Sequence, residues 1–334
     1  MIPAKRFLVA GGAGFIGSHL VRRLLREAST EEITVIDNFS TGDPANLAEV
    51  KDDPRITVLT VDITEPLHHH AKYDWVLHLA AIANPTDYEK SPLETLHVNS
   101  RGNEQLIRLA ARAEARYAFF SSSEVYGYYR QIPRGGLRED TMSHLVLNQA
   151  RSPYPVGKCF GEEITKYLAD RYGVPYVIIR PFNVYGPDMD IKTNYGRVIP
   201  NFIRWALSAE SLKVQGDGRQ IRTFCHIDDF IEALMIVLQH PAPPTVLNIG
   251  SPIPTPVLTL AKLVNRLTGN TAGIEFVEKY PYETFSRIPD IRRIRSLGWR
   301  PGSNWKKASA KPSTGSKAAP LRLPGPGHQN ILPA

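Results

Sequence analysis

Gly11-Gly12-Ala13-Gly14-Phe15-Ile16-Gly17 is the stretch that decides the fold of this sequence. It follows an apolar run at residues 7–10 that is typical of a strand, and it opens residues 15–27, whose apolar spacing is typical of a helix. Glycines in this spacing permit a tight turn, close approach of a pyrophosphate, and packing of the helix on the strand. The helix N-terminus presents N–H groups to phosphates. The stretch therefore predicts a Rossmann-type dinucleotide site.

Asp37 indicates which dinucleotide binds. It ends the second predicted strand, twenty positions after Gly17. A carboxylate at this place accepts hydrogen bonds from the adenosine ribose hydroxyls and repels a 2′-phosphate. The predicted cofactor is therefore NAD rather than NADP.

Strand patterns and helix patterns alternate through the first half of the chain. The strand patterns occupy residues 7–10, 33–36, 56–61, 75–79, 117–121 and 176–180, and the helix patterns occupy residues 15–27, 92–115 and 154–172. This alternation predicts an α/β fold with a doubly wound parallel sheet. After residue 180 the elements become shorter and richer in Pro, Gly and Asn. We expect residues 1–180 to form an NAD-binding Rossmann domain, and residues 181–305 to form mainly a smaller C-terminal α/β lobe that binds substrate.

The positive charge of the chain is concentrated near its end. The formal net charge is +7, but five basic and no acidic residues follow Trp305, which leaves +2 for residues 1–305. A body so close to neutral does not predict a nucleic-acid partner. Residues 306–334 are rich in Ala, Ser, Pro, Gly and Lys, a composition that predicts a disordered tail.

Other features indicate a soluble protein without a metal. The apolar runs are too short to span a membrane, and a strand pattern begins too near the N-terminus for a signal peptide. Two cysteines, Cys159 and Cys225, form neither a disulfide framework nor a ligand pattern, which favours the cytoplasm. The adjacent side chains of His68, His69 and His70 diverge, so we expect no metal site.

Tyr154 and Lys158 carry the predicted chemistry. They lie four residues apart, on one face of a predicted helix. An ammonium beside a phenol favours the phenolate, so this tyrosine can take a proton from a substrate hydroxyl near neutral pH. Ser122 follows a predicted strand and can hydrogen-bond the same hydroxyl.

These motifs together resemble the extended short-chain dehydrogenase/reductase family over about residues 5–300. The resemblance runs through GGAGFIG (11–17), VDI (61–63), HLAA (78–81), SSSEVYG (121–127), YPVGK (154–158), RPFNVYGP (180–187), GDGRQIRTF (216–224), NIG (248–250) and PDIRRIRSLGWRP (289–301). It implies an enzyme that oxidises a nucleotide sugar at C4 with NAD, acts on the ketone and usually returns the hydride. It also implies a homodimer formed through the helices of residues 92–115 and 154–172.

The motifs and the resemblance together predict two sets of ligand contacts. The expected cofactor contacts are Gly11, Gly14, Phe15, Ile16, Gly17, Asp37, Asn38, Asp62, Ile63, Leu79, Ala80, Ala81, Asn99, Tyr154 and Lys158. The expected substrate contacts are Pro85, Ser123, Asn183, Arg197, Val198, Gln215, Arg222 and Arg287. By the resemblance, Asp62 and Ile63 flank adenine, Ala80 lies near the nicotinamide, and Asn183 and Arg222 contact a UDP diphosphate.

Glu124 bears on the reaction that the ketone at C4 undergoes. By the resemblance, a 4-epimerase needs no carboxylate beside the sugar and usually carries a small residue there. A 4,6-dehydratase uses an Asp-Glu pair, and Ser123 stands where the aspartate would supply the proton. UDP-glucuronate decarboxylases carry a Thr-Ser-Glu run at this place and an arginine just before a Pro-Asp-Ile turn.

Arg287 stands just before Pro289-Asp290-Ile291 and so matches that arginine. Its guanidinium can bind a carboxylate or organise proton delivery. The predicted catalytic residues are Tyr154, Lys158, Ser122, Glu124 and Arg287. The favoured reaction converts UDP-glucuronate to UDP-4-keto-pentose, UDP-xylose or both, and a 4-epimerase or dehydratase remains the alternative. A non-catalytic NAD sensor ranks below these, because such proteins typically lose the Tyr–Lys pair.

The end of the chain departs from the resemblance. Relatives continue beyond Pro301 into a closing helix, whereas this chain continues into a Ser- and Lys-rich stretch. Back-translated with permitted codons and read one base earlier, that stretch can encode such a helix. We hypothesise that a frameshift produced this tail, the alternative being a natural disordered tail. Sequencing the gene tests this, since a reading frame that cannot encode the helix contradicts it.

Overall fold

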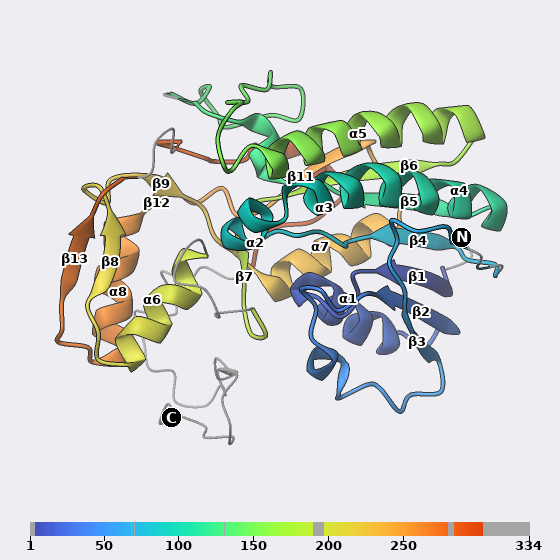
Figure 1. The fold of residues 1–334 in the computed structure, drawn as a ribbon, viewed down its shortest axis with the longest axis horizontal. Helices are drawn as coiled ribbons and strands as arrows, with labels where there is room; N and C mark the ends of the chain where they lie inside the picture. Colours follow the sequence, from blue (N-terminus) through green and yellow to red (C-terminus); the bar gives the residue numbers. More distant parts are fainter. Residues whose placement is uncertain are drawn as a thin grey trace.

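A parallel sheet of seven strands forms the centre of the computed structural model, in the order β11-β6-β5-β4-β1-β2-β3 (Figure 1). All six pairings are parallel, which confirms the predicted Rossmann-type α/β fold. The strands are β1 Arg6–Ala10, β2 Glu32–Asp37, β3 Ile56–Thr60, β4 Trp75–His78, β5 Arg116–Phe120, β6 Tyr176–Pro181 and β11 Val246–Ile249. The structure describes residues 4–67, 69, 71–129, 131–189, 197–279 and 284–302, so the predicted tail, 306–334, lies outside the described residues.

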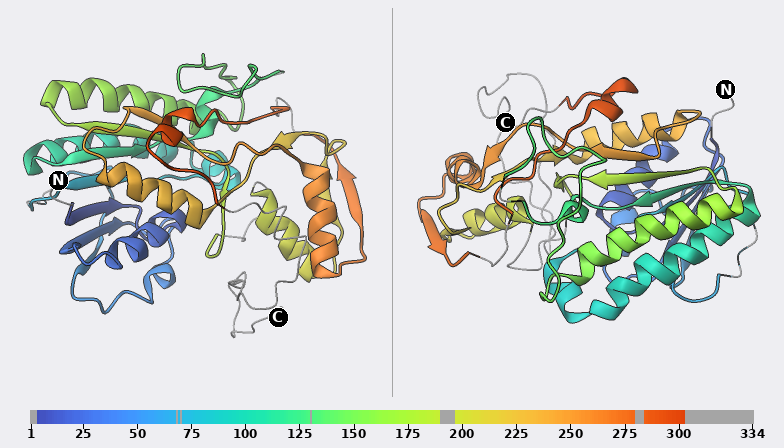
Figure 2. Two further views of the ribbon diagram at one scale, coloured as in Figure 1. Left: turned by 180° about the vertical axis from the view of Figure 1, so that it is seen from behind. Right: turned by 90° about the horizontal axis from the view of Figure 1, so that it is seen from above.

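Helices cover both faces of this sheet (Figures 1 and 2). Helices α1 (Phe15–Leu25) and α7 (Ile227–Gln239) pack on one face, and α4 (Asn103–Ala113) and α5 (Pro153–Tyr172) pack on the other. The central strand β1 is apolar on both sides, because Phe7 and Val9 join the first core and Leu8 and Ala10 join the second. A strand buried on both faces accounts for the unbroken apolar run that the sequence shows there.

The segment predicted as one helix over residues 92–115 is divided. Helix α3 (Pro92–His97) and α4 are separated by η2, a π-helical turn at Val98–Gly102. In this turn the carbonyl of Val98 lies 3.1 Å from His78 Nε2, so a buried side chain of β4 binds a carbonyl at the start of the irregular turn. Apolar periodicity cannot reveal such an insertion, since the flanking turns keep their apolar faces.

A smaller α/β lobe lies at one end of the sheet (Figure 1). Helices α6 (Val198–Leu207) and α8 (Val257–Thr268) pack with the parallel pair β8 (Leu212–Gln215) and β13 (Ile274–Val277) around their own core. This confirms the predicted small C-terminal lobe.

The remaining elements of the chain are η1 Pro44–Leu47, α2 Pro85–Lys90, η3 Ser123–Tyr126, β7 Val184–Tyr185, β9 Ile221–Arg222, β10 Cys225–His226, β12 Thr255–Pro256 and α9 Arg292–Ser296.

The chain crosses between the two units more than once. After β10 it returns to the large sheet through α7 and β11, and then enters the lobe again at β12. The functional division at residue 180 therefore stays a prediction, because residues 227–249 belong to the sheet layer. Of the helices described, none has the length and apolar character to cross a membrane.

Asn103 joins α4, α5 and β5 inside the second core. Its Nδ2 donates to the carbonyl of Gly161 at 2.8 Å, and its Oδ1 accepts from the Tyr117 hydroxyl at 2.6 Å. Asn103 and Tyr117 are both fully buried. A buried hydroxyl that loses its acceptor is costly, so this asparagine should contribute strongly to stability.

Replacing Asn103 with leucine should lower the free energy of unfolding by about 1–3 kcal/mol, because the Tyr117 hydroxyl would lose its acceptor. In a second variant that also carries Tyr117→Phe, the hydroxyl is absent and part of the lost stability should return. Urea denaturation measures both values. Equal losses in the single and double variants would contradict this account.

Candidate functional site

The glycine-rich turn has the geometry that the sequence predicts for a dinucleotide site. Gly11 has φ of +80°, and a Cβ there would lie 2.5 Å from the backbone nitrogen of Ala80. A Cβ on Gly17 would overlap the carbonyl oxygen of Gly11, so α1 can approach β1 this closely only with glycine. Gly14 caps α1 without a side chain, and the helix N-terminus therefore faces the turn.

Asp37 lies beside this turn at the end of β2. Its Oδ2 accepts from the backbone N–H of Ala13 and its Oδ1 accepts from that of Phe39, both at 2.9 Å. Burial raises the pKa of Asp37, although these two hydrogen bonds lower it. The carboxylate is thus held in one orientation at the edge of a cavity.

That cavity has a volume of about 250 Å³. Its wall includes many of the predicted cofactor contacts, namely Gly11, Gly14, Asp37, Asn38, Asp62, Ile63, Leu79, Ala80 and Ala81. Asn38 donates from Nδ2 to Asp62 Oδ2 at 3.0 Å, which joins the ends of β2 and β3. The glycine cradle and the fixed carboxylate fit an adenine dinucleotide, and a side chain at Gly11 would fill the cradle.

A second, larger cavity of about 480 Å³ lies where the sheet meets the small lobe. Its wall includes the other predicted ligand contacts, namely Phe15, Ile16, Pro85, Ser122, Ser123, Glu124, Tyr154, Asn183, Arg197, Val198, Gln215, Arg222 and Arg287. Gly17, Asn99 and Lys158 line neither cavity and are buried behind the walls. The structure therefore brings the predicted residues to one region, from elements that are distant in sequence.

Tyr154, Ser122 and Lys158 come together at the end of β5. Burial raises the pKa of Tyr154 to about 12, while its hydrogen bond with Ser122 lowers it. Lys158 is 1% exposed, and its Nζ donates to the carbonyl of Phe120 at 2.8 Å and lies 5.9 Å from the centre of the Tyr154 ring. Burial lowers the pKa of Lys158 to about 7, against the nearby charge of Glu162. Both shifts favour the neutral form of the side chain, so burial moves the pKa values of Tyr154 and Lys158 apart.

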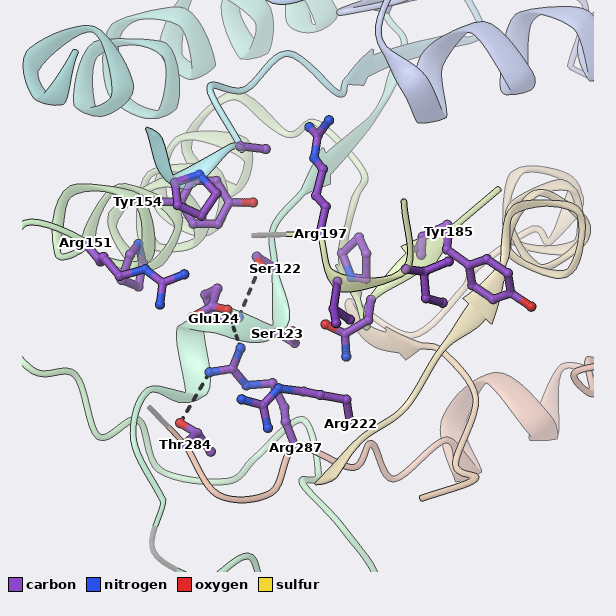
Figure 3. Close-up of a pocket in the computed structure, with 18 of the residues that line it drawn as sticks. Ser122, Ser123, Glu124, Arg151, Tyr154, Tyr185, Arg197, Arg222, Thr284 and Arg287 are labelled. Carbon is purple, nitrogen blue, oxygen red and sulfur yellow. Dashed lines mark hydrogen bonds and ion pairs between the residues drawn. The ribbon is translucent and has the colours of Figure 1, made fainter. Parts of the chain in front are cut away.

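Glu124 and Arg287 form an ion pair on the floor of the same cavity (Figure 3). They are 163 residues apart in sequence. Backbone hydrogen bonds bring the Arg287 segment here, from Leu137 N–H to Ile288 O at 2.8 Å and from Arg287 N–H to Ile221 O at 3.3 Å. Burial alone would raise the pKa of Glu124, but the charge and hydrogen bond of Arg287 hold that pKa below its ordinary value. Glu124 is therefore an anion in this structure.

The charge of the larger cavity is strongly positive. Among the residues described there, five are cationic and one is anionic, namely Arg151, Arg197, Lys213, Arg222 and Arg287 against Glu124. Figure 3 shows all four of the arginines around Ser122 and Glu124. Such a lining suits a ligand with several negative charges, because each guanidinium can bind a phosphate or carboxylate through two N–H groups.

Two residues of this site carried no predicted role. The Tyr88 ring stacks on the Tyr154 ring with centroids 5.3 Å apart and planes at 13°, and Arg151 Nε donates to the Tyr88 hydroxyl at 3.3 Å. Tyr88 lies on α2, and Arg151 lies three residues before Tyr154. The position of Arg151 close to Tyr154 in sequence could have indicated that it belongs to the site. The stacking of Tyr88 on Tyr154 could not be predicted in this way, because it depends on tertiary structure.

A buried ion pair supports the helix that carries Tyr154. Arg180 on β6 donates to Glu162 on α5 through Nε at 2.8 Å and through Nη2 at 2.6 Å. Ser121 Oγ donates to the same Glu162 carboxylate at 2.5 Å, and Arg180 Nη1 donates to the Tyr126 hydroxyl at 2.9 Å. Both charged side chains are about nine-tenths buried, so each depends on the other for its charge to be tolerated.

Glu162→Gln should lower the free energy of unfolding by up to about 3–5 kcal/mol, because the Arg180 guanidinium would lose its buried counter-charge. Glu163→Gln is the matched control, since it makes the same change at the adjacent, exposed position. Chemical denaturation compares the two variants. If both variants were equally stable, the charge of Glu162 would contribute nothing to stability.

Comparisons with known proteins agree with this fold. The model of the NAD dependent epimerase/dehydratase family matches residues 7–250. UDP-glucuronic acid decarboxylase 6 of Arabidopsis thaliana is 38% identical over 89% of this chain and 84% of its own length. The structure of DesIV, a dTDP-glucose 4,6-dehydratase from Streptomyces venezuelae with NAD bound, is 28% identical, covers 90% of this chain and 94% of its own, and has a TM-score of 0.80. UDP-glucuronic acid 4-epimerase from Bacillus cereus, in complex with UDP-glucuronic acid and NAD, is 26% identical, covers 91% and 96%, and has a TM-score of 0.78. This chain belongs to the NAD dependent epimerase/dehydratase family.

Proposed function

We propose that this protein decarboxylates UDP-glucuronic acid through a 4-keto intermediate and forms UDP-4-keto-pentose, UDP-xylose or both. The observation that carries the proposal is the Glu124–Arg287 ion pair beside Tyr154, in a cavity with a positive lining. Several relatives are UDP-glucuronic acid decarboxylases. They are 35–38% identical to this chain, and each match covers about nine-tenths of it. The substrate carries a diphosphate and a carboxylate, and both suit the arginines of the site.

The first step is the oxidation of C4. Tyr154 takes the proton of the C4 hydroxyl while the C4 hydrogen leaves as hydride. Lys158 stabilises the phenolate of Tyr154, and Ser122 hydrogen-bonds the same hydroxyl. When bound, NAD supplies the acceptor and later the donor of this hydride. The cofactor contacts that we propose for it are the residues of the smaller cavity, together with Phe15, Ile16, Gly17, Asn99, Tyr154 and Lys158.

The second step is the loss of carbon dioxide. A ketone at C4 makes the sugar a β-keto acid, so the C5–C6 bond breaks and its electron pair enters an enolate. A proton taken up from solvent and delivered to C5 from the side of Glu124 and Arg287 gives the 4-keto-pentose, since the ionised Glu124 carries no proton of its own. Return of the hydride to C4, with the proton held by Tyr154, gives UDP-xylose.

The alternatives fit the same residues less well. A dehydratase needs a carboxylic acid where this chain has Ser123, whose side chain is almost fully buried in η3. A 4-epimerase has no use for Glu124. Both alternatives use Tyr154 and Lys158, so the products decide between them.

Incubation with UDP-glucuronate and NAD⁺ should release carbon dioxide and a UDP-pentose, as followed by mass spectrometry. Glu124→Gln should bind the substrate but slow the formation of the UDP-pentose by about 10²–10⁴-fold, the range for loss of a group that takes part in proton transfer. Recovery of the C4 epimer without carbon dioxide, or turnover of UDP-glucose instead, would identify an epimerase. An unchanged rate of UDP-pentose formation by Glu124→Gln would refute the role of that carboxylate.

We also propose a homodimer through the outer faces of α3 and α5. Leu93, Phe160 and Tyr167 lie on these helices and are 62%, 54% and 65% exposed. Large apolar side chains on adjacent helices favour burial against a second copy. A cytoplasmic location is proposed as well, because Cys159 and Cys225 are free thiols.

Phe160→Glu combined with Tyr167→Glu should convert the dimer to a monomer, because both charges would be buried at the interface. Phe276→Glu is the control, since Phe276 is a similarly exposed apolar residue on β13 of the small lobe. Sedimentation velocity at micromolar concentration measures the masses. A monomeric unmodified protein, or a dimer that survives the double substitution, would contradict the proposal.

A further inference from the structure

Arg151 lies near the groups that act on the two reacting carbons of the sugar, Tyr154 for C4 and Glu124 for C5. Arg151 lies just before α5 and lines the larger cavity. Its Nε donates to the hydroxyl of Tyr88, whose ring is stacked on Tyr154. In Figure 3 its guanidinium extends from the side of Tyr154 toward Glu124. The positive charge of Arg151 also acts on Glu124 and helps to keep it ionised.

The chemistry of the site determines where the substrate carboxylate must lie. Tyr154 and Ser122 hold the C4 hydroxyl, and Glu124 lies on the side of C5. The carboxylate is bonded to C5, next to C4, so it must lie within a few ångströms of both groups. A cation near both Tyr154 and Glu124 is therefore close to the carboxylate of a bound sugar acid.

Arg287 is less suited to this task than the sequence alone indicates. Its Nη1 is paired with Glu124, and its Nη2 lies 3.5 Å from Thr284 Oγ1. Its side chain is only 9% exposed, whereas that of Glu124 is 43% exposed. The charge of Arg287 is largely balanced by Glu124, and a second carboxylate would compete with the first.

Arg197 and Arg222 approach the cavity from the small lobe. Arg197 precedes α6, and Arg222 lies on β9, where its Nη1 donates to the carbonyl of Ile221 at 2.8 Å. Both belong to the lobe whose wall also contains Lys213 and Gln215. The charge of Arg197 acts on Tyr154 and that of Arg222 acts on Glu124, so each relates to one of these two groups. Arg151 relates to both, to Tyr154 through the stacked ring of Tyr88 and to Glu124 through its charge.

We infer that Arg151 binds the carboxylate of the sugar acid and so determines specificity for UDP-glucuronate over neutral UDP-sugars, while Arg287 holds Glu124. This inference rests on the proposed function. A planar guanidinium can bind a carboxylate through two parallel N–H···O bonds. A site built around such a pair rejects a sugar with a neutral C6, because the cation enclosed by the bound sugar would lose its partner.

Binding to variants in a Tyr154→Phe background tests the inference, because the ligands are then not consumed. Isothermal titration calorimetry should be carried out with UDP-glucuronate, UDP-glucose and UDP. Arg151→Gln should weaken UDP-glucuronate by about 10–100-fold, as expected for a lost charge-assisted hydrogen-bond pair, and should change the other two ligands by less than about twofold. Arg151→Lys should recover part of the loss. Arg222→Gln should weaken all three ligands alike.

Two further variants separate direct binding from an effect on structure. Arg171→Gln removes the same charge from an exposed position near the end of α5 and should change nothing. Tyr88→Phe removes the hydroxyl that Arg151 contacts but keeps the stacked ring, so the preference for UDP-glucuronate should remain. Loss of that preference in Tyr88→Phe, or equal weakening of all three ligands by Arg151→Gln, would overturn the inference.

The unsubstituted protein distinguishes this inference from the proposed function. If it releases carbon dioxide from UDP-glucuronate while Arg151→Gln binds UDP-glucuronate normally, only the inference fails. If it shows no preference for UDP-glucuronate and releases no carbon dioxide, the proposed function fails first. Normal turnover with a selective loss of affinity in Arg151→Gln supports both.

Discussion

The hydrogen bond from Lys158 to the carbonyl of Phe120 fixes the active arrangement. It joins Lys158, in the first half of α5, to Phe120, the last residue of β5. Lys158 is almost completely buried there. The chain leaves β5 directly into Ser122 and Glu124, and α5 carries Tyr154 one turn before Lys158. A shift of helix against strand would therefore move all of these groups relative to one another. Because Lys158 is buried, its ammonium needs a hydrogen-bond acceptor within the protein, and the carbonyl of Phe120 supplies one.

The burial of Lys158 changes its own pKa and is linked to the ionisation of neighbouring side chains. The pKa of Lys158 falls to about 7, and the pKa of His78, on the adjacent strand, falls to about 3, first through burial and then through the charge of Lys158. Glu162 opposes the shift of Lys158, and it is itself held by Arg180 and Ser121. The ionisation of the central lysine thus depends on an ion pair that does not touch the cavity. Such support is needed because an isolated buried ammonium would lose its proton.

Sequence patterns predicted the elements whose periodicity is regular. Asp37 and the glycines of residues 11–17 lie where their spacing requires, since a strand, a turn and a helix start allow little freedom there. The π-helical turn η2 was not predicted, because one inserted residue leaves the apolar pattern almost unchanged. The role of Tyr88 was not predictable either, as stacking on Tyr154 requires α2 to lie against the start of α5. Local patterns determine elements, whereas contacts between distant elements depend on packing.

Several motifs of the second half act by positioning Arg287 rather than by facing the cavity. Asn248, at the end of β11, donates to the carbonyls of Leu137 and Asp290 at 2.8 and 3.2 Å, and it accepts from the Tyr126 hydroxyl at 2.7 Å. Tyr126 in turn receives a hydrogen bond from Arg180. The loop that carries Arg287 is therefore tied to the same buried network that holds α5. Because one network supports both sides of the site, Tyr154 and the Glu124–Arg287 pair keep a fixed relation, and the oxidation at C4 and the chemistry at C5 can act on one bound sugar without its moving.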